Sequence, residues 1–249
     1  MGCSGGDLRR RRRLLALSIQ AHTLISEGAG EVHRAMNVYP VCLINLHEKR
    51  CVVVGGGGVA ERRVGALLAC QARVIVISPT LTPGLRHWAE TGKLTHVARS
   101  YRNGDLEGAF LCIAASNDRA VNEQVWREGS ARGVLVNLVD DMTRSHFIVP
   151  AVVRRGDLTI AISTGGHSPA LAARIKEELA ALFGPEYEDL LQLLGALRPR
   201  LRAELSAQGR RAFADAVLGS DICSLLREGD RAGARARLEE ILESIEEQG

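Results

Sequence analysis

The chain has 249 residues, a formal net charge of +3, 46% hydrophobic residues and an aromatic share of 4%. This length accommodates one large or two small domains with hydrophobic cores, and the hydrophobic content excludes a disordered chain. The weak positive charge, without interleaved aromatic residues, argues against nucleic-acid binding, and no apolar run is long enough for a membrane span. The six cysteines form no C-x-x-C pair, which favours reduced thiols and a cytoplasmic protein.

Residues 1–35 are predicted to be an N-terminal extension without a fold of its own. Arg9–Arg13 run into a short apolar stretch like the start of a signal peptide, but polar residues interrupt it and no cleavage site follows. Strand-like sequence begins at 38–43. Because Met36 stands just before it, Met36 is a candidate for the true start of the protein.

Four glycines stand between a β-branched strand and a helical pattern, in the sequence VVVGGGGVAERRV at 52–64. Strand, glycine turn and helix in this order open a βαβ unit. Gly55, Gly57 and Ala60 fit the dinucleotide fingerprint G-x-G-x-x-G/A. Gly55 would make the turn, Gly57 would leave room for a pyrophosphate at the helix N-terminus, and Ala60 would let the helix approach the strand. A purely structural turn is the weaker alternative.

The other two glycines, Gly56 and Gly58, occupy the variable positions of the fingerprint. Its last element is an acidic residue that holds the ribose at the end of the second strand. That strand instead ends in Ser78, Pro79 and Thr80, and the hydroxyls are candidate partners of the ribose. With neither an acid nor an obvious arginine for a 2′-phosphate there, these residues leave the choice between NAD and NADP open.

Strand-like and helical segments alternate from residue 38 to 139, which predicts a Rossmann-type, doubly wound parallel sheet, an α/β fold, over 36–146. Further strands are expected at 94–98, 109–115 and 134–139. Ligands bind beyond the carboxyl ends of the strands in such sheets. We therefore expect the Gly55 turn, the loop at Ser116 and the pair Asp140 and Asp141 to meet in one crevice.

The pattern changes after this sheet. Two strands, at 147–153 and 158–163, precede a glycine turn and a helix that Ser168 caps and that ends near residue 183. We expect 147–185 to be a small α+β dimerisation region, because two strands after a complete sheet need partners for their edges. Residues 186–249 are predicted to form a helical C-terminal region, with leucine stripes typical of a core or of a partner surface.

Four stretches of the chain, in this order, resemble precorrin-2 dehydrogenase, the dehydrogenase and often ferrochelatase module of siroheme synthases. They are GGGGVAERR at 55–63, AASND at 114–118, NLVD at 137–140 and STGGHSPA at 163–170. The first is generic to dinucleotide sites, and the last two are more specific. The resemblance implies homodimers that oxidise precorrin-2 to sirohydrochlorin with NAD, and some family members also insert ferrous iron to make siroheme. The helical tail matches only loosely.

The resemblance also places site residues. Asp140 takes the position of the family's essential carboxylate, where a base would accept the proton that leaves the macrocycle; capping of the next turn is the alternative. Cofactor contacts are expected at the fingerprint and at the ends of the neighbouring strands: Gly55, Gly57, Gly58, Val59, Ala60, Ser78, Pro79, Thr80, Ala115 and Ser116.

The substrate carries eight carboxylates, so its pocket needs cations and N–H donors. The candidates for substrate binding are Arg144, His146, Gly165, Gly166, His167 and Ser168. Arg154, Arg155 and Lys176 are further candidate cations. Each of these three residues, like Arg144, is individually more typical of a solvated surface charge. The two histidines lack the accompanying ligands of a metal site, so no resident metal is predicted.

Two questions stay open at the level of sequence. Thr164 stands where some relatives have a serine that can be phosphorylated, which leaves such regulation doubtful. The rival function is a regulatory Rossmann domain that senses NAD without catalysis. Such a sensor would need neither Asp140 nor the glycine turn at 165–166.

Overall fold

The computed structural model describes residues 38–247, and the predicted extension at 1–35 lies outside them. The described helices and strands all belong to one compact unit, Val41–Gly249. The strand expected at 38–43 is wrong: this stretch is irregular, and Tyr39 and Val41 are 85% and 65% exposed. A β-branched composition does not make a strand where no neighbour in the described chain supplies a hydrogen-bond ladder.

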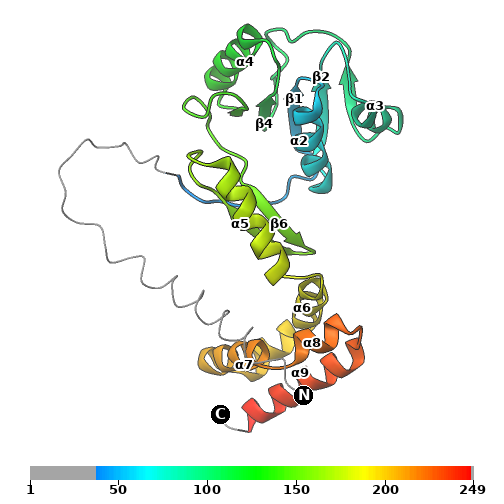
Figure 1. Ribbon diagram of the computed structural model, residues 1–249, viewed down its shortest axis with the longest axis vertical. Coiled ribbons are helices and arrows are strands. Elements are labelled where there is room, and N and C mark those ends of the chain that lie inside the picture. The colour runs from blue at the N-terminus through cyan, green and yellow to red at the C-terminus, as the bar shows by residue number, and fades with distance from the viewer. Residues whose placement is uncertain (1–37, 248–249) are drawn as a thin grey trace, which may run out of the picture. The chain divides into compact units, whose positions relative to one another are not determined.

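Five parallel strands form the central sheet of the described chain, in the order β3-β2-β1-β4-β5 (Figure 1). They are β1 Arg50–Val54, β2 Arg73–Ile77, β3 Thr95–Val97, β4 Leu111–Ala114 and β5 Leu135–Leu138. The order reverses between β1 and β4, so the carboxyl ends of these two strands border the crevice where ligands bind in such sheets.

Helices cover both faces of the sheet. Helix α2 (Gly58–Ala69) and helix α3 (Pro83–Glu90) pack on one face, and α4 (Arg119–Arg132) packs on the other. Successive residues of β1 belong to the two different cores, Val52 to the core under α4 and Val53 to the core under α2. Strands buried on both sides are typical of doubly wound sheets. The predicted Rossmann-type fold is confirmed.

The chain that follows β5 covers the outer edge of this strand. Val136 N donates to His146 Nδ1 at 3.1 Å, and His146 N donates back to Val136 O at 2.8 Å. Leu138 N donates to Ser145 Oγ at 2.9 Å. Side chains thus occupy the outward-facing N–H groups of the edge strand.

The next two strands form a separate antiparallel hairpin, β6 Ala151–Arg155 and β7 Leu158–Ile162. Strand β6 begins later than expected, because Phe147 packs into the core of the parallel sheet and its carbonyl accepts from Asn137 Nδ2. Helix α5 (Pro169–Leu182) runs beside β6 (Figure 1), and the Ser168 side chain caps it as predicted.

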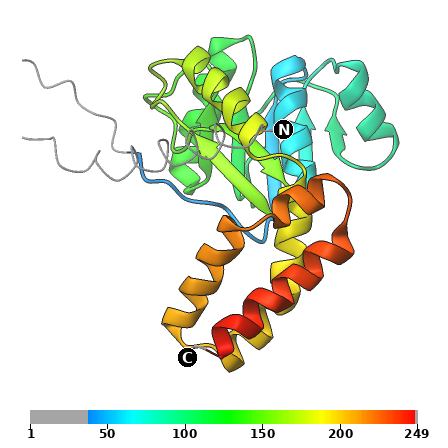
Figure 2. The same cartoon turned by 60° about the horizontal axis from the view of Figure 1, so that its bottom comes forward.

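The C-terminal region is helical, as predicted, and has a core of its own (Figure 2). It comprises α6 Glu186–Glu204, α7 Ala207–Gly219, α8 Ile222–Arg227 and α9 Arg231–Glu246. Phe213, Ile222, Leu238 and Leu242 are its most buried large residues. In the described part of the chain, every helix is too short or too polar to cross a membrane.

A buried carboxylate fixes the loop between β3 and β4. Glu128 of α4 is 6% exposed and accepts hydrogen bonds from the Tyr101 hydroxyl, from Gly104 N and from Leu106 N. It also pairs with Arg132 at 2.8 Å. Burial acts to raise the pKa of Glu128, but these bonds and the arginine outweigh it and hold the pKa below the ordinary 4.5.

We expect Glu128→Ala to lower the free energy of unfolding by about 3–5 kcal/mol, because it leaves buried donors without an acceptor. The stabilisation is present above the ordinary pKa of 4.5 and is lost as the pH falls through the lower folded value. Urea unfolding of wild type and variant should therefore converge in acid. Glu107→Ala, at an exposed position of the same loop, is the control; equal losses in the two variants would contradict this role.

Candidate functional site

The turn between β1 and α2 lies directly against two neighbouring loops. Gly55 has φ +123°, and a Cβ there would collide with the backbone carbonyl of Ala115, after β4. A Cβ on Gly56 would collide with Thr80 O and lie 2.7 Å from Ser78 Oγ, after β2. Only glycine fits at these two positions. The Gly55 turn and the loop at Ser116 therefore meet, as predicted, and the loop after β2 meets the same turn.

Gly56 is therefore not a variable position, and that part of the fingerprint assignment is wrong. Its carbonyl accepts from Thr82 N at 3.0 Å, while Gly55 N donates to Ile77 O at 2.9 Å. The fingerprint describes contacts with the cofactor, whereas Gly56 is constrained by the loop after β2. The pattern contains no information about that loop.

The beginning of α2 is open. A Cβ on Gly57 or Gly58 would meet no atom of the described chain within 4 Å. Helices α3, α4 and α5 are each capped by a side chain, but among the described residues none caps α2 at Gly57. The free N–H groups and the positive end of the helix dipole fit a pyrophosphate there. Gly57, Gly58, Val59 and the buried Ala60 lie at this open helix start.

The expected ribose contacts differ in exposure. Ser78 is 6% exposed beneath Gly56, and its carbonyl accepts from His96 Nε2 at 2.9 Å. Pro79 and Thr80 are exposed at the end of β2. Of the two hydroxyls, that of Thr80 is therefore the better placed to meet a ribose. On the other side of the turn, the Ser116 hydroxyl accepts from Asp118 N at 3.1 Å.

Asp140 lies exposed just after β5, and one side chain ties it to the Ser116 loop. Asn122 Nδ2 donates to Asp140 Oδ2 at 3.3 Å and to Ser116 O at 3.0 Å. Within residues 38–247, the Asp140 carboxylate forms no other hydrogen bond. The alternative, that Asp140 caps the next turn, is wrong: the side chain of Asp141 accepts from the N–H groups of Thr143 and Arg144.

Arg144 is held in a network of charges. It pairs with Glu123 and with Asp141, and its guanidinium lies 5.7 Å from the centroid of the Trp126 ring. Hydrogen bonds from the Thr143 hydroxyl and from Arg144 lower the pKa of Asp141 to about 2. The positive charge of Arg144 is thus compensated by carboxylates of the chain itself, which weakens its candidacy as a substrate cation.

The glycine turn before α5 reaches the same loop as Asp140. Gly165 and Gly166 have φ of 59° and 80°, and Gly166 lies against the Met142 side chain. His167 Nδ1 bonds Thr164 O at 3.0 Å, which leaves its Nε2 for a ligand.

The other two candidates of this region have local partners. His146 Nδ1 bonds the edge of β5, as described above, so only Nε2 of His146 is left for a ligand. The Ser168 hydroxyl accepts from Leu171 N at 3.2 Å, which accounts for this residue by helix capping.

The remaining basic residues divide into two groups. Arg155 donates to the carbonyls of Ala180 and Phe183 at the end of α5, so its role is structural. Arg154 and Lys176 are exposed, and no carboxylate of the described residues pairs with either.

Sequence reasoning missed Arg63 of α2, which is half-buried and likewise lacks a carboxylate partner in the described chain. Burial and the positive charge of neighbouring Arg62 lower the pKa of Arg63.

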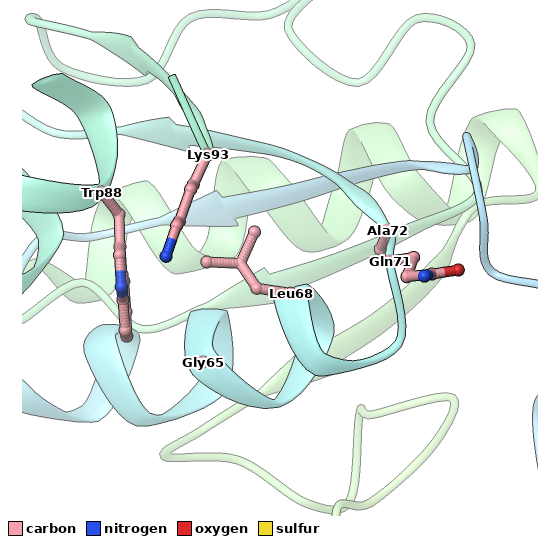
Figure 3. A pocket seen from close by; sticks show the side chains of 6 residues that line it. All are labelled: Gly65, Leu68, Gln71, Ala72, Trp88 and Lys93. Atoms are coloured by element: carbon pink, nitrogen blue, oxygen red, sulfur yellow. The ribbon is translucent and has the colours of Figure 1, made fainter. Parts of the chain in front are cut away.

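A hollow of about 380 Å³ lies away from this crevice, between α2 and α3 (Figure 3). Trp88, Leu68 and Lys93 line it, beside Ala72 at the amino end of β2. Ligands of open α/β sheets bind at the opposite, carboxyl ends of the strands. No cluster of His, Cys, Asp and Glu among the described residues has the arrangement of a metal site.

The glycine-bounded crevice and the open start of α2 define a dinucleotide-binding protein of the Rossmann type. Three family models match this chain in succession: NAD(P)-binding at 42–151, sirohaem biosynthesis protein central at 155–182, and sirohaem synthase dimerisation region at 186–242. The model described as a dimerisation region covers 186–242. It therefore lies C-terminal to 147–185, the range in which we expected dimerisation.

Curated relatives and a solved structure agree with these models. The siroheme synthases of Chromobacterium violaceum and Xylella fastidiosa are 38% and 40% identical over 82% and 80% of this chain. The chain spans 43% and 42% of their lengths, less than half of each. The structure of SirC, precorrin-2 dehydrogenase, is 28% identical with a TM-score of 0.64, covering 84% of this chain and 100% of that chain. The chain belongs to the precorrin-2 dehydrogenase and siroheme synthase family, as its motifs predict.

We expect Gly57→Asp to weaken dinucleotide binding at least a hundredfold, about 3 kcal/mol, because its carboxylate would face the pyrophosphate. The fold should tolerate the change, since a Cβ at this position meets open space and φ is −88°. Calorimetry with NAD measures the affinity. In contrast, Gly56→Ala should lower the melting temperature. Unchanged affinity in a folded Gly57→Asp variant would remove the fingerprint from the site.

Proposed function

We propose that the chain oxidises precorrin-2 to sirohydrochlorin with NAD as the acceptor. The observation that supports it is that Asn122 donates both to Asp140 and to the Ser116 carbonyl. The carboxylate is thereby tied to the loop that lies against the Gly55 turn, just before the open start of α2. This juxtaposes a dinucleotide site with a base, as a dehydrogenase requires. The likeness to SirC, precorrin-2 dehydrogenase, over most of the chain supports the substrate.

The reaction removes two electrons and two hydrogens from the macrocycle: precorrin-2 and NAD⁺ give sirohydrochlorin, NADH and one proton. When bound, the nicotinamide supplies the acceptor for the hydride that leaves a ring carbon. Asp140 accepts the accompanying proton on its carboxylate and, being exposed, returns it to water. Arg63 and Lys176 lack a carboxylate partner in the described chain and are the candidates for holding substrate carboxylates. Arg154 is a weaker candidate, because it lies beside Cys70 at the end of α2 remote from the open start of that helix.

NAD is proposed over NADP because of the residues at the end of β2. A 2′-phosphate requires a cation near the ribose, and Ser78, Pro79 and Thr80 supply none. Hydroxyl groups there suit the 2′-hydroxyl of NAD. We assign the ribose contact to Thr80, because it is exposed while Ser78 is buried.

Asp140→Asn should lower kcat by about 10²–10⁴-fold, because the amide cannot accept the proton. NAD affinity should be retained, because Asp140 follows β5 and does not belong to the proposed nucleotide turn between β1 and α2. Appearance of NADH and of sirohydrochlorin, followed by absorbance, measures the reaction. The control is Glu107→Gln, at an exposed loop position. A folded wild type that binds NAD but produces no NADH from precorrin-2 would favour the sensor function instead.

We propose ferrous-ion insertion into sirohydrochlorin as a second activity of the same carboxylate. Asp140 is exposed and makes a single hydrogen bond in the described chain, so pyrrole N–H protons can reach it. The metal would enter as substrate, held by the macrocycle. The rate of metal insertion is measured for wild type and Asp140→Asn with sirohydrochlorin and cobaltous ion. Omitting NAD separates this step from the oxidation. Normal insertion by Asp140→Asn would restrict Asp140 to oxidation, and a wild type at the uncatalysed rate would exclude chelation.

We also propose that the chain is a homodimer. An apolar hollow of about 510 Å³ lies between α6 and α7, lined by Leu191, Leu194, Phe213, Val217 and Leu218. Leu218 is 68% exposed, which is unusual for a leucine with nothing to pack against. The hollow lies in the range matched by the sirohaem synthase dimerisation region. A second copy of the chain is the occupant that this match supports.

Sedimentation distinguishes this helical interface from the strand interface at 147–185. We expect Leu218→Arg to weaken the dimer at least tenfold, about 1.4 kcal/mol, by placing a charge in an apolar interface. Ala161→Lys, on an exposed position of β7, tests the strands in the same way. Dissociation by Ala161→Lys alone would assign the interface to 147–185, and a monomeric wild type at micromolar concentration would contradict both.

A further inference from the structure

Asn122 is one of the few polar side chains buried in the parallel-sheet domain. It is 3% exposed, in the first turns of α4, on the side that packs near β4 and β5. Its amide nitrogen donates to Ser116 O at 3.0 Å and to Asp140 Oδ2 at 3.3 Å. The two acceptors follow different strands, β4 and β5. Asn122 is therefore a bridge between the loops that follow β4 and β5.

The orientation of this amide is determined by its neighbours. Both partners, a backbone carbonyl and a carboxylate, are acceptors only, so the nitrogen must face them and both of its N–H groups are used. The oxygen, Asn122 Oδ1, is buried without a partner among the described residues. A buried acceptor without a bond costs free energy. The amide is placed in this way although its oxygen stays unbonded, which points to a role of the two N–H bonds beyond stability.

The bridge has a rigid base. Asn122 N donates to Asp118 O at 3.1 Å, and Asp118 caps α4 while its own N–H donates to the Ser116 hydroxyl. The Ser116 loop, the helix start and Asn122 thus form one hydrogen-bonded body. Ser116 lies next to Ala115, against which Gly55 packs. A chain of direct contacts thus connects the nucleotide turn, the Ser116 loop, Asn122 and Oδ2 of Asp140.

We propose that Asn122 is the positioning residue that sets the Asp140 carboxylate relative to the cofactor loop. By engaging Oδ2, it leaves Oδ1 as the atom that takes the proton. Because Asn122 is buried, it acts through Asp140 rather than by touching substrate or cofactor. This inference rests on the proposed oxidation of precorrin-2, because it assigns to Asn122 the geometry of that proton transfer.

The test is a double-mutant cycle with steady-state kinetics. Asn122→Ala should lower kcat about tenfold, with the Kd of NAD and the KM of precorrin-2 within about threefold of wild type. In an Asp140→Asn background the same change should cost less than about twofold, because its effect acts through the missing carboxylate. If the two residues acted independently, the factors by which the two substitutions lower kcat would instead multiply. The control is Gln124→Ala, on the exposed side of the same helix, which should leave kcat unchanged.

A second variant guards against misfolding. Asn122→Asp is nearly isosteric, but it places a carboxylate against Asp140. Because two carboxylates that share one site repel, the acid limb of the kcat profile should move to higher pH. A merely structural residue would lower the melting temperature without moving this limb.

The outcomes separate the two claims. A wild type inert toward precorrin-2 overturns the proposed function together with this inference. An active wild type whose kcat is insensitive to Asn122→Ala overturns the inference alone. The inference alone is likewise overturned if Asn122→Ala weakens only NAD binding, or if its effect on kcat is the same with and without Asp140→Asn. It is also overturned if folded Asn122→Asp keeps the wild-type pH profile of kcat. A non-additive cycle with a shifted profile establishes the positioning role.

Discussion

The contact of Gly55 and Gly56 with the neighbouring loops is the constraint on which the rest of the site depends. Because these residues lack a Cβ, the turn after β1 can lie against the backbone at Ala115 and Thr80. This contact determines where α2 begins and where the loops after β2 and β4 run. The helix start, the ribose contacts and, through Asn122, the carboxylate are then positioned relative to one another by backbone rather than by flexible side chains.

The sequence was sufficient for features that depend on neighbouring residues. The doubly wound parallel sheet, the capping of α5 by Ser168 and the start of α2 at the glycine turn follow from periodicity, local hydrogen bonding and the glycine pattern. Features that depend on distant contacts were not predictable in this way. The packing of Gly56 against Thr80, the bridge at Asn122 and the late start of β6 all involve residues far apart in the chain, and 38–43 lacks the neighbour that a strand needs.

The basic residues illustrate the same limit for charge. In sequence, Arg144, Arg154 and Arg155 are equivalent candidates for an anionic substrate. In the fold, carboxylates neutralise Arg144, and the end of α5 occupies Arg155. Arg63 of α2 is half-buried and lacks a carboxylate partner in the described chain. The fingerprint gave no sign of it, because that pattern concerns only the glycines and Ala60. The useful property of a binding cation is the absence of a counter-charge, and only the structure displays it.

The side-chain cover on β5 has a consequence for how the protein behaves at high concentration. The outward N–H groups of an edge strand can template growth of the sheet by another chain. Ser145 and His146 occupy those of Val136 and Leu138 with bonds from within the same molecule. At the other end, β3 is only three residues long. Neither border of this five-stranded sheet offers another chain a long row of free N–H groups, which disfavours strand-by-strand polymerisation of the folded protein.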